Sequence, residues 1–136
     1  MHRFLLAIVL LVPGLAFAEE APSLALELNA LQPSDAGCRI TFLATNGLGG
    51  PLDKTTFEVA LFGAEGGLDR LVSLDFQKLT PGKTKVLQFE LSGLDCTSVS
   101  RVLVNDVTAC DGTEIAAAAC LDHLTTSSRA KPQFGL

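Results

Sequence analysis

The stretch that decides the fold is TTFEVALFGAEGGLDRLVSLDFQKLTPGKTKVLQFEL, residues 55–91. Apolar side chains alternate with others along three segments of it, which is the period of a half-buried β-strand. A glycine-rich turn over residues 63–67 separates the first two segments. The Pro81-Gly82 pair separates the last two, because proline presets φ for a turn and glycine accepts a positive φ. The stretch therefore predicts three antiparallel strands.

The first of these strands has large side chains on both faces. Phe57, Val59 and Leu61 point one way, and Ala60 and Phe62 point the other. A sheet with one face in water is normally polar on that face. Either another segment covers the second face, or the face is an apolar patch that binds a partner. Phe62, close to the end of the strand, is the first candidate for a partner contact.

The rest of the chain repeats the same alternation between turn signals. Further strands are expected over residues 24–29, 38–45 and 96–104, the last ending at Asn105-Asp106. Turns about ten residues apart between short strands are typical of an antiparallel sandwich. The predicted fold class is all-β, a small antiparallel immunoglobulin-like sandwich of about seven strands. Residues 114–121 stay open between strand and short helix, because alanine favours helix.

The N-terminus has the pattern of a cleavable signal peptide over residues 1–18, MHRFLLAIVLLVPGLAFA. A short basic start precedes an apolar run, and Ala16-Phe17-Ala18 supplies a cleavage pattern. The run is too short to span a bilayer as a helix, which takes roughly 20 residues. No cysteine directly follows the cleavage site, so a lipoprotein is not expected. Arg3 has no second arginine beside it, which disfavours twin-arginine export. We therefore expect export in the unfolded state by the Sec route, to the periplasm or the medium.

The charge and the aromatic content of the chain limit the classes of partner that it is expected to bind. Loss of the signal peptide leaves 118 of 136 residues and moves the formal charge from −5 to about −6. An acidic chain of this kind is not expected to bind nucleic acid or an anionic membrane surface. No later segment is apolar enough to insert into a membrane. The chain has no Trp and no Tyr, which disfavours a sugar-stacking site.

The four cysteines predict two disulfides. Cys38, Cys96, Cys110 and Cys120 all lie in the exported part, and an even number in an oxidising compartment favours structural pairing. If the strands run up and down in order, Cys38 and Cys96 meet at one end of the sandwich, which leaves Cys110 with Cys120. The main alternative pairs Cys96 with Cys110 and Cys38 with Cys120.

No pattern of cysteine and histidine predicts a cofactor. A redox site would need Cys-x-x-Cys, and structural zinc would need closely paired ligands. His123 is the only histidine after the signal peptide. A Ser-His-Asp triad could be drawn from His123, an aspartate and Ser127 or Ser128, but the chain has no G-x-S-x-G elbow to hold a nucleophilic serine. We expect no catalytic residues, no cofactor and no enzyme activity.

Acidic residues near the C-terminus do not match a metal loop. Asp106, Asp111 and Glu114 miss the alternate-residue spacing of an EF-hand loop, so no metal ligand is predicted. Two other segments add possible partner contacts. The glycine-rich loop over residues 46–51 contains Leu48 and is either a plain connector or a contact loop. Residues 125–136 are polar and predict a disordered tail with Phe134 as its large apolar residue.

The pattern from residue 38 to residue 106 resembles small exported bacterial proteins of unknown function. It reads CRITFLATNGLG, FEVALF, LDFxxLxPGKT with FxL, and RVLVND. The pieces NGL, VALF and PGKTxV are similar to fibronectin-III or immunoglobulin-like sandwich modules of extracytoplasmic proteins. These are scaffold motifs, so the resemblance implies a fold and a compartment and carries over no functional residue.

The sequence thus predicts residues 1–18 as signal peptide, 19–124 as a β-sandwich domain and 125–136 as a flexible tail. The leading functional hypothesis is a disulfide-stapled, non-enzymatic binding or accessory module for a protein partner in the bacterial envelope. The alternative is a periplasmic protein that binds a small ligand or a metal ion through its acidic C-terminal turns. An enzyme is the third hypothesis.

Overall fold

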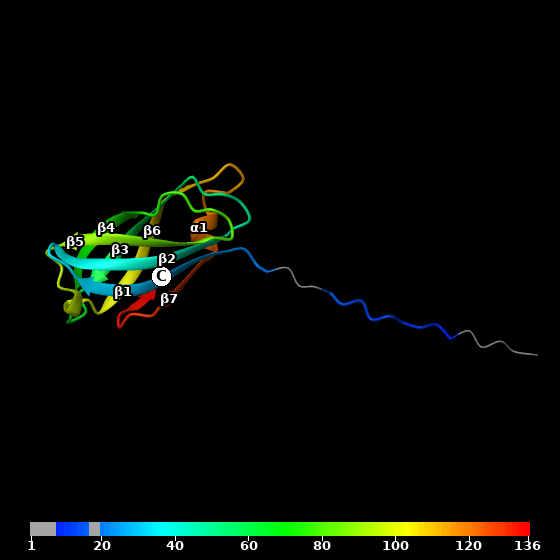
Figure 1. Ribbon diagram of the computed structural model, residues 1–136, viewed down its shortest axis with the longest axis horizontal. Helices are drawn as coiled ribbons and strands as arrows, with labels where there is room; N and C mark the ends of the chain where they lie inside the picture. The colour runs from blue at the N-terminus through cyan, green and yellow to red at the C-terminus, as the bar shows by residue number, and fades with distance from the viewer. Residues whose placement is uncertain (1–7, 17–19) are drawn as a thin grey trace, which may run out of the picture.

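Two four-stranded sheets form a sandwich in the computed structural model, which describes residues 8–16 and 20–136 (Figure 1). The predicted all-β sandwich is confirmed, with eight strands in the described residues. In chain order the elements are β1 (Ser23–Pro33), β2 (Gly37–Gly47), β3 (Lys54–Phe62), β4 (Leu68–Asp75), β5 (Thr84–Ser92), the 3-10 helix η1 (Cys96–Ser98), β6 (Arg101–Asp111), the helix α1 (Ala119–Asp122), β7 (Leu124–Ser128) and β8 (Gln133–Gly135).

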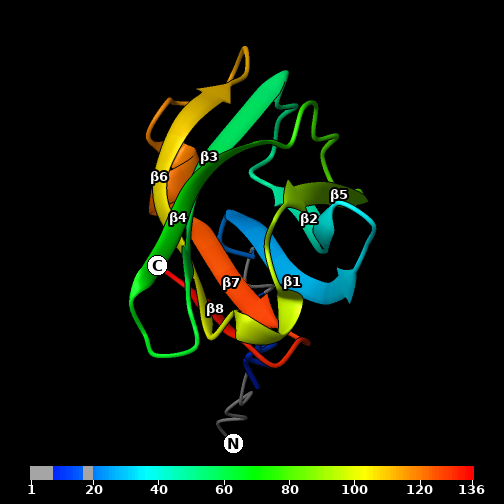
Figure 2. The same cartoon turned by 90° about the vertical axis from the view of Figure 1, so that its left-hand side faces the viewer.

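The strand order is β5-β2-β1-β7 in one sheet and β4-β3-β6-β8 in the other, and Figure 2 shows the two sheets as layers. β1, β2 and β5 pair antiparallel, as do β4, β3 and β6. These two triplets match the A-B-E and C′-C-F strands of an immunoglobulin sandwich. β7 and β8 differ, because β7 runs parallel to β1 and β8 runs parallel to β6.

Phenylalanines fill the centre between the sheets. Phe42, Phe57 and Phe76 are fully buried, and the ring centroid of Phe76 lies 5.5 Å from that of Phe42 and 4.9 Å from that of Phe57. Phe89 is half-buried, and its ring contacts the rings of Phe42 and Phe76. The alternation of the sequence therefore identified the core face correctly, because β-strand side chains point to opposite faces in turn.

The prediction of a disordered C-terminal tail is wrong. Residues 124–128 form β7 on the edge of β1, and residues 133–135 form β8 on the edge of β6. Leu124 and Phe134 insert into the core, and the side chain of Phe134 is only 7% exposed. The polar composition arises because these are edge strands whose remaining side chains face water. The sandwich domain thus extends past residue 124 to residue 135.

The start and the end of β6 also differ from the sequence prediction. Cys96 lies in η1, whose first turn is capped by the Asp95 carboxylate, and β6 begins at Arg101. β6 continues through Asn105-Asp106 to Asp111, with register shifts opposite residues 56–59 of β3. These β-bulges admit extra residues, so a polar pair that suggested a strand end lies inside a strand instead.

The two ends of the sandwich carry one disulfide each. The η1 pole, defined by η1 and the turn over residues 34–36, holds the bond between Cys38 and Cys96. The α1 pole, defined by α1 and the loop over residues 46–51, holds the bond between Cys110 and Cys120. The predicted pairing is confirmed and the alternative pairing is wrong. Two disulfides are consistent with an oxidising compartment.

For residues 114–121 the sequence left strand and short helix open. At the C-terminal end of this segment the chain is helical, because α1 forms one helical turn there. Residues 8–16 and 20–22 have no helix or strand. The signal-peptide prediction falls partly on residues 1–7 and 17–19, which lie outside the described residues. None of the helices in the part of the chain that the structure describes has the length and apolarity to cross a membrane.

Candidate functional site

The outer face of the β4-β3-β6 sheet carries a group of apolar side chains at the end nearest the η1 pole. Two rows cross the three strands, one of Leu68, Phe62 and Arg101 and one of Leu71, Ala60 and Leu103. We call these six residues the Phe62 face. Leu68 is 56% exposed and Leu71 is 50% exposed. The second face of β3, which the sequence left open, is therefore only partly covered.

A β-bulge puts Leu68 on this face. Leu61 pairs with Arg70 and Phe62 pairs with Leu68, so Asp69 is an extra residue in β4. Strict alternation from Leu71 would have turned Leu68 toward the core. Bulges re-aim side chains and often lie next to functional sites. Strand periodicity alone does not place Leu68 on the same face as Leu71 for this reason, although the spacing of three residues between the two leucines already departs from a strand period.

Arg101 covers part of the Phe62 ring. The guanidinium carbon lies 5.5 Å from the ring centroid, in a cation–π arrangement. An arginine within a strand is expected to pair with a carboxylate across the sheet, and here the contact with the aromatic ring takes the place of such a pair. Polar groups border the apolar centre, since the Asn105 side-chain amide donates to the Glu58 carboxylate at 2.6 Å. The face thus combines an apolar centre, an arginine and a polar margin.

The other two predicted contact residues lie elsewhere. Leu48 is at the α1 pole, half-buried against the core, and its backbone N–H donates to the Asn46 side chain at 3.0 Å. Phe134 is buried between the sheets, with its ring centroid 5.4 Å from that of Phe42. Phe62, Leu48 and Phe134 therefore do not form one surface, and Phe134 is not accessible to a partner.

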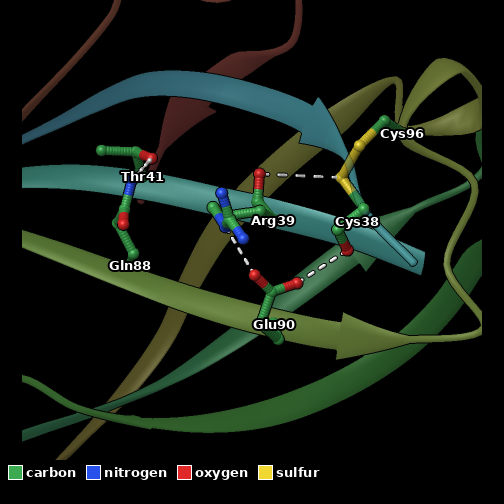
Figure 3. Close-up of polar contacts among 7 residues, drawn as sticks. Cys38, Arg39, Thr41, Gln88, Glu90 and Cys96 are labelled. Atoms are coloured by element: carbon green, nitrogen blue, oxygen red, sulfur yellow. Dashed lines mark hydrogen bonds and ion pairs between the residues drawn. A yellow bond between two sulfur atoms is a disulfide. The ribbon is translucent and has the colours of Figure 1, made fainter. Parts of the chain in front are cut away.

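The outer face of the other sheet carries a polar network instead (Figure 3). Arg39 of β2 forms an ion pair with Glu90 of β5, its direct neighbour in the register. The Ser34 hydroxyl donates to the same carboxylate at 2.7 Å. This hydrogen bond, together with the one from the Arg39 guanidinium, holds the pKa of the Glu90 carboxyl below its ordinary value. The pair of Arg39 and Glu90 is thus a surface contact between neighbouring strands.

The histidine and the serines considered for a Ser-His-Asp triad take part in other contacts or lie on an edge strand. His123 is exposed at the end of α1, and its backbone carbonyl accepts from the Leu24 N–H at 2.9 Å. Ser127 lies on the edge strand β7. Ser128 is the last residue of β7, and its hydroxyl donates to the backbone carbonyls of Ala130 and Pro132 in the turn before β8.

Among the described residues, no three His, Cys, Asp or Glu side chains are grouped closely enough to hold a metal ion. Asp106, Asp111 and Glu114 are exposed, and the Asp106 carboxylate accepts from the Val107 N–H at 2.8 Å. All four cysteines are in disulfides.

Comparison of the chain with protein-family models, with curated proteins and with solved structures finds no match.

Proposed function

We propose that this protein is an exported, non-enzymatic module that binds a protein partner in the bacterial cell envelope through the Phe62 face. The observation that carries the proposal is the exposure of Leu68 and Leu71 beside the half-buried ring of Phe62. Apolar side chains gathered on one face of a sheet mark interaction sites more often than scattered ones do.

The shape of the Phe62 face favours a protein over a small molecule. Its six residues come from three adjacent strands of one sheet, so the partner would meet a broad surface. Small-molecule sites are concave and enclose most of the ligand. Protein interfaces combine an apolar centre with a polar margin, and arginine and aromatic residues are frequent in their strongest contacts. Arg101 stacked on Phe62 fits that description.

Export and compartment are part of the same proposal. The pattern of residues 1–18 supports a signal peptide for the Sec route, and two disulfides support folding in an oxidising compartment such as the periplasm. The resemblance to small exported bacterial sandwich proteins agrees with that location.

The test is capture from envelope extracts by the full chain, expressed with its N-terminal segment and carrying a C-terminal tag. The variant Leu68→Asp/Leu71→Asp places two charges in the Phe62 face. Its matched control is Val86→Asp, because Val86 is 61% exposed on the outer face of the other sheet. We expect the wild type and Val86→Asp to enrich the same protein and the double variant to lose it. Equal capture by all three, or no enrichment over the tag alone, contradicts the proposal.

A further inference from the structure

A groove of about 430 Å³ opens at the η1 pole, away from the Phe62 face. It lies between the end of β1, the segment from η1 to Val99 and the turn that joins β7 to β8. Small-molecule sites in proteins have volumes of roughly 300–1,000 Å³ and are lined mostly by apolar side chains. The size of this groove falls in that range.

The walls of the groove are side chains of the hydrophobic core. Val99 and Pro132 are buried, and Leu31, Cys96 and Ala130 pack against the core with one side still exposed. Apolar surface left in water at a concave place favours an apolar ligand, because each additional buried methylene strengthens binding. The hydroxyl of Thr97, a further lining residue, already donates to the Asp95 carboxylate at 2.7 Å.

One lining residue is charged. Lys131 is exposed in the turn before β8 and belongs to the lining. Among the residues that the structure describes, the ion pairs are Arg39–Glu90 and Arg70–Asp69, so the Lys131 ammonium is free to pair with a ligand. Asp95 is the acidic residue closest in sequence to η1, and its carboxylate accepts from the backbone and side chain of Thr97.

We infer that this groove binds a single-chain anionic amphiphile, a free fatty carboxylate. The alkyl chain lies against Leu31, Val99 and Ala130, and the carboxylate pairs with the Lys131 ammonium. Charge complementarity selects this occupant, because Lys131 is a cation and, among the described residues that line the groove, the only charged one in a mainly apolar lining. The inference goes beyond the proposed partner binding and concerns a different surface.

The test is nuclear magnetic resonance titration of the exported full chain with dodecanoate below its micelle concentration. We expect saturable amide shifts centred on residues 30–33, 96–99 and 130–132. Dodecyltrimethylammonium, with the same chain and the opposite charge, and acetate, with no chain, should each bind at least about tenfold more weakly. Shortening the chain should raise Kd by roughly fourfold per methylene removed.

Two variants separate the charge from the apolar wall. Lys131→Glu should weaken dodecanoate at least about tenfold, whereas Lys83→Glu, in the turn at the α1 pole, should leave Kd unchanged. Ala130→Phe should fill the groove and abolish the shifts. Leu68→Asp/Leu71→Asp should bind dodecanoate normally, which keeps this result distinct from partner capture. The inference is overturned if the shifts fall outside the groove, if dodecanoate does not bind, or if Lys131→Glu and Lys83→Glu behave alike.

Discussion

The ring of Phe134, from the last strand of the chain, packs against the ring of Phe42 at the centre of the core, with the centroids 5.4 Å apart. Phe42 is fully buried and belongs to β2, which lies inside the other sheet. The chain leaves β7 on one sheet and enters β8 on the other. The C-terminal residues therefore join the two layers and close the core.

Phe134→Ala should lower the free energy of unfolding by about 3–5 kcal/mol, because it removes a buried ring and leaves a cavity. The measurement is urea denaturation followed by circular dichroism. Leu136→Ala is the control, since Leu136 is 59% exposed, and it should change stability by less than about 0.5 kcal/mol. Equal midpoints for both variants would show that β8 does not contribute to the core.

Asn46→Ala should destabilise the α1 pole. The buried Asn46 amide donates to the carbonyls of Gly50 and Leu79 at 2.9 and 2.8 Å, and its carbonyl accepts from the Leu48 N–H. Leaving such buried groups without partners costs about 1–3 kcal/mol. Asn29→Ala is the matched control, because the Asn29 amide contacts only the Glu27 side chain. Thermal melts that shift equally for both variants would contradict this assignment.

The two disulfides should differ in their contribution to stability. The bond between Cys38 and Cys96 closes a loop with a sequence separation of 58, and that between Cys110 and Cys120 closes one of 10. On the chain-entropy account, the long loop contributes about 4 kcal/mol and the short loop about 3 kcal/mol. The double alanine variant of each pair, compared by guanidinium denaturation, should follow that order. The reverse order would mean that native contacts at the α1 pole outweigh loop entropy.

Glu90 should make the free energy of unfolding depend on pH in the acidic range. The hydrogen bonds from Ser34 and Arg39 place the pKa of the folded-state carboxyl below the ordinary value of 4.5. A depressed pKa stabilises the fold above the unfolded-state pKa, and this contribution is lost as the pH falls through the folded-state value. The stability difference between wild type and Glu90→Gln should therefore shrink from about pH 6 to about pH 3. Glu65→Gln, in the turn between β3 and β4, is the control, and a difference independent of pH would contradict the account.

The sequence by itself determined the three strands within residues 55–91 and the face of these strands that is buried. The alternation of Phe57, Val59 and Leu61 specified which side of β3 is buried, because the side-chain period of a strand is two. The turn at Pro81-Gly82 could be recognised because φ at proline and at glycine is a local property. These features depend on neighbouring residues in the chain.

Only the tertiary structure decided the position of the last twelve residues and the make-up of the exposed face. Residues 125–136 are polar because β7 and β8 are edge strands, and their pairing with β1 and β6 joins segments distant in sequence. Leu68 faces outward because a bulge opposite Phe62 shifts the register. The groove beside Lys131 exists because three separate segments meet at one pole. Edge pairing and grooves arise from contacts between distant segments, which hydrophobic periodicity does not specify. The bulge is visible in the sequence only as the irregular spacing of Leu68 and Leu71.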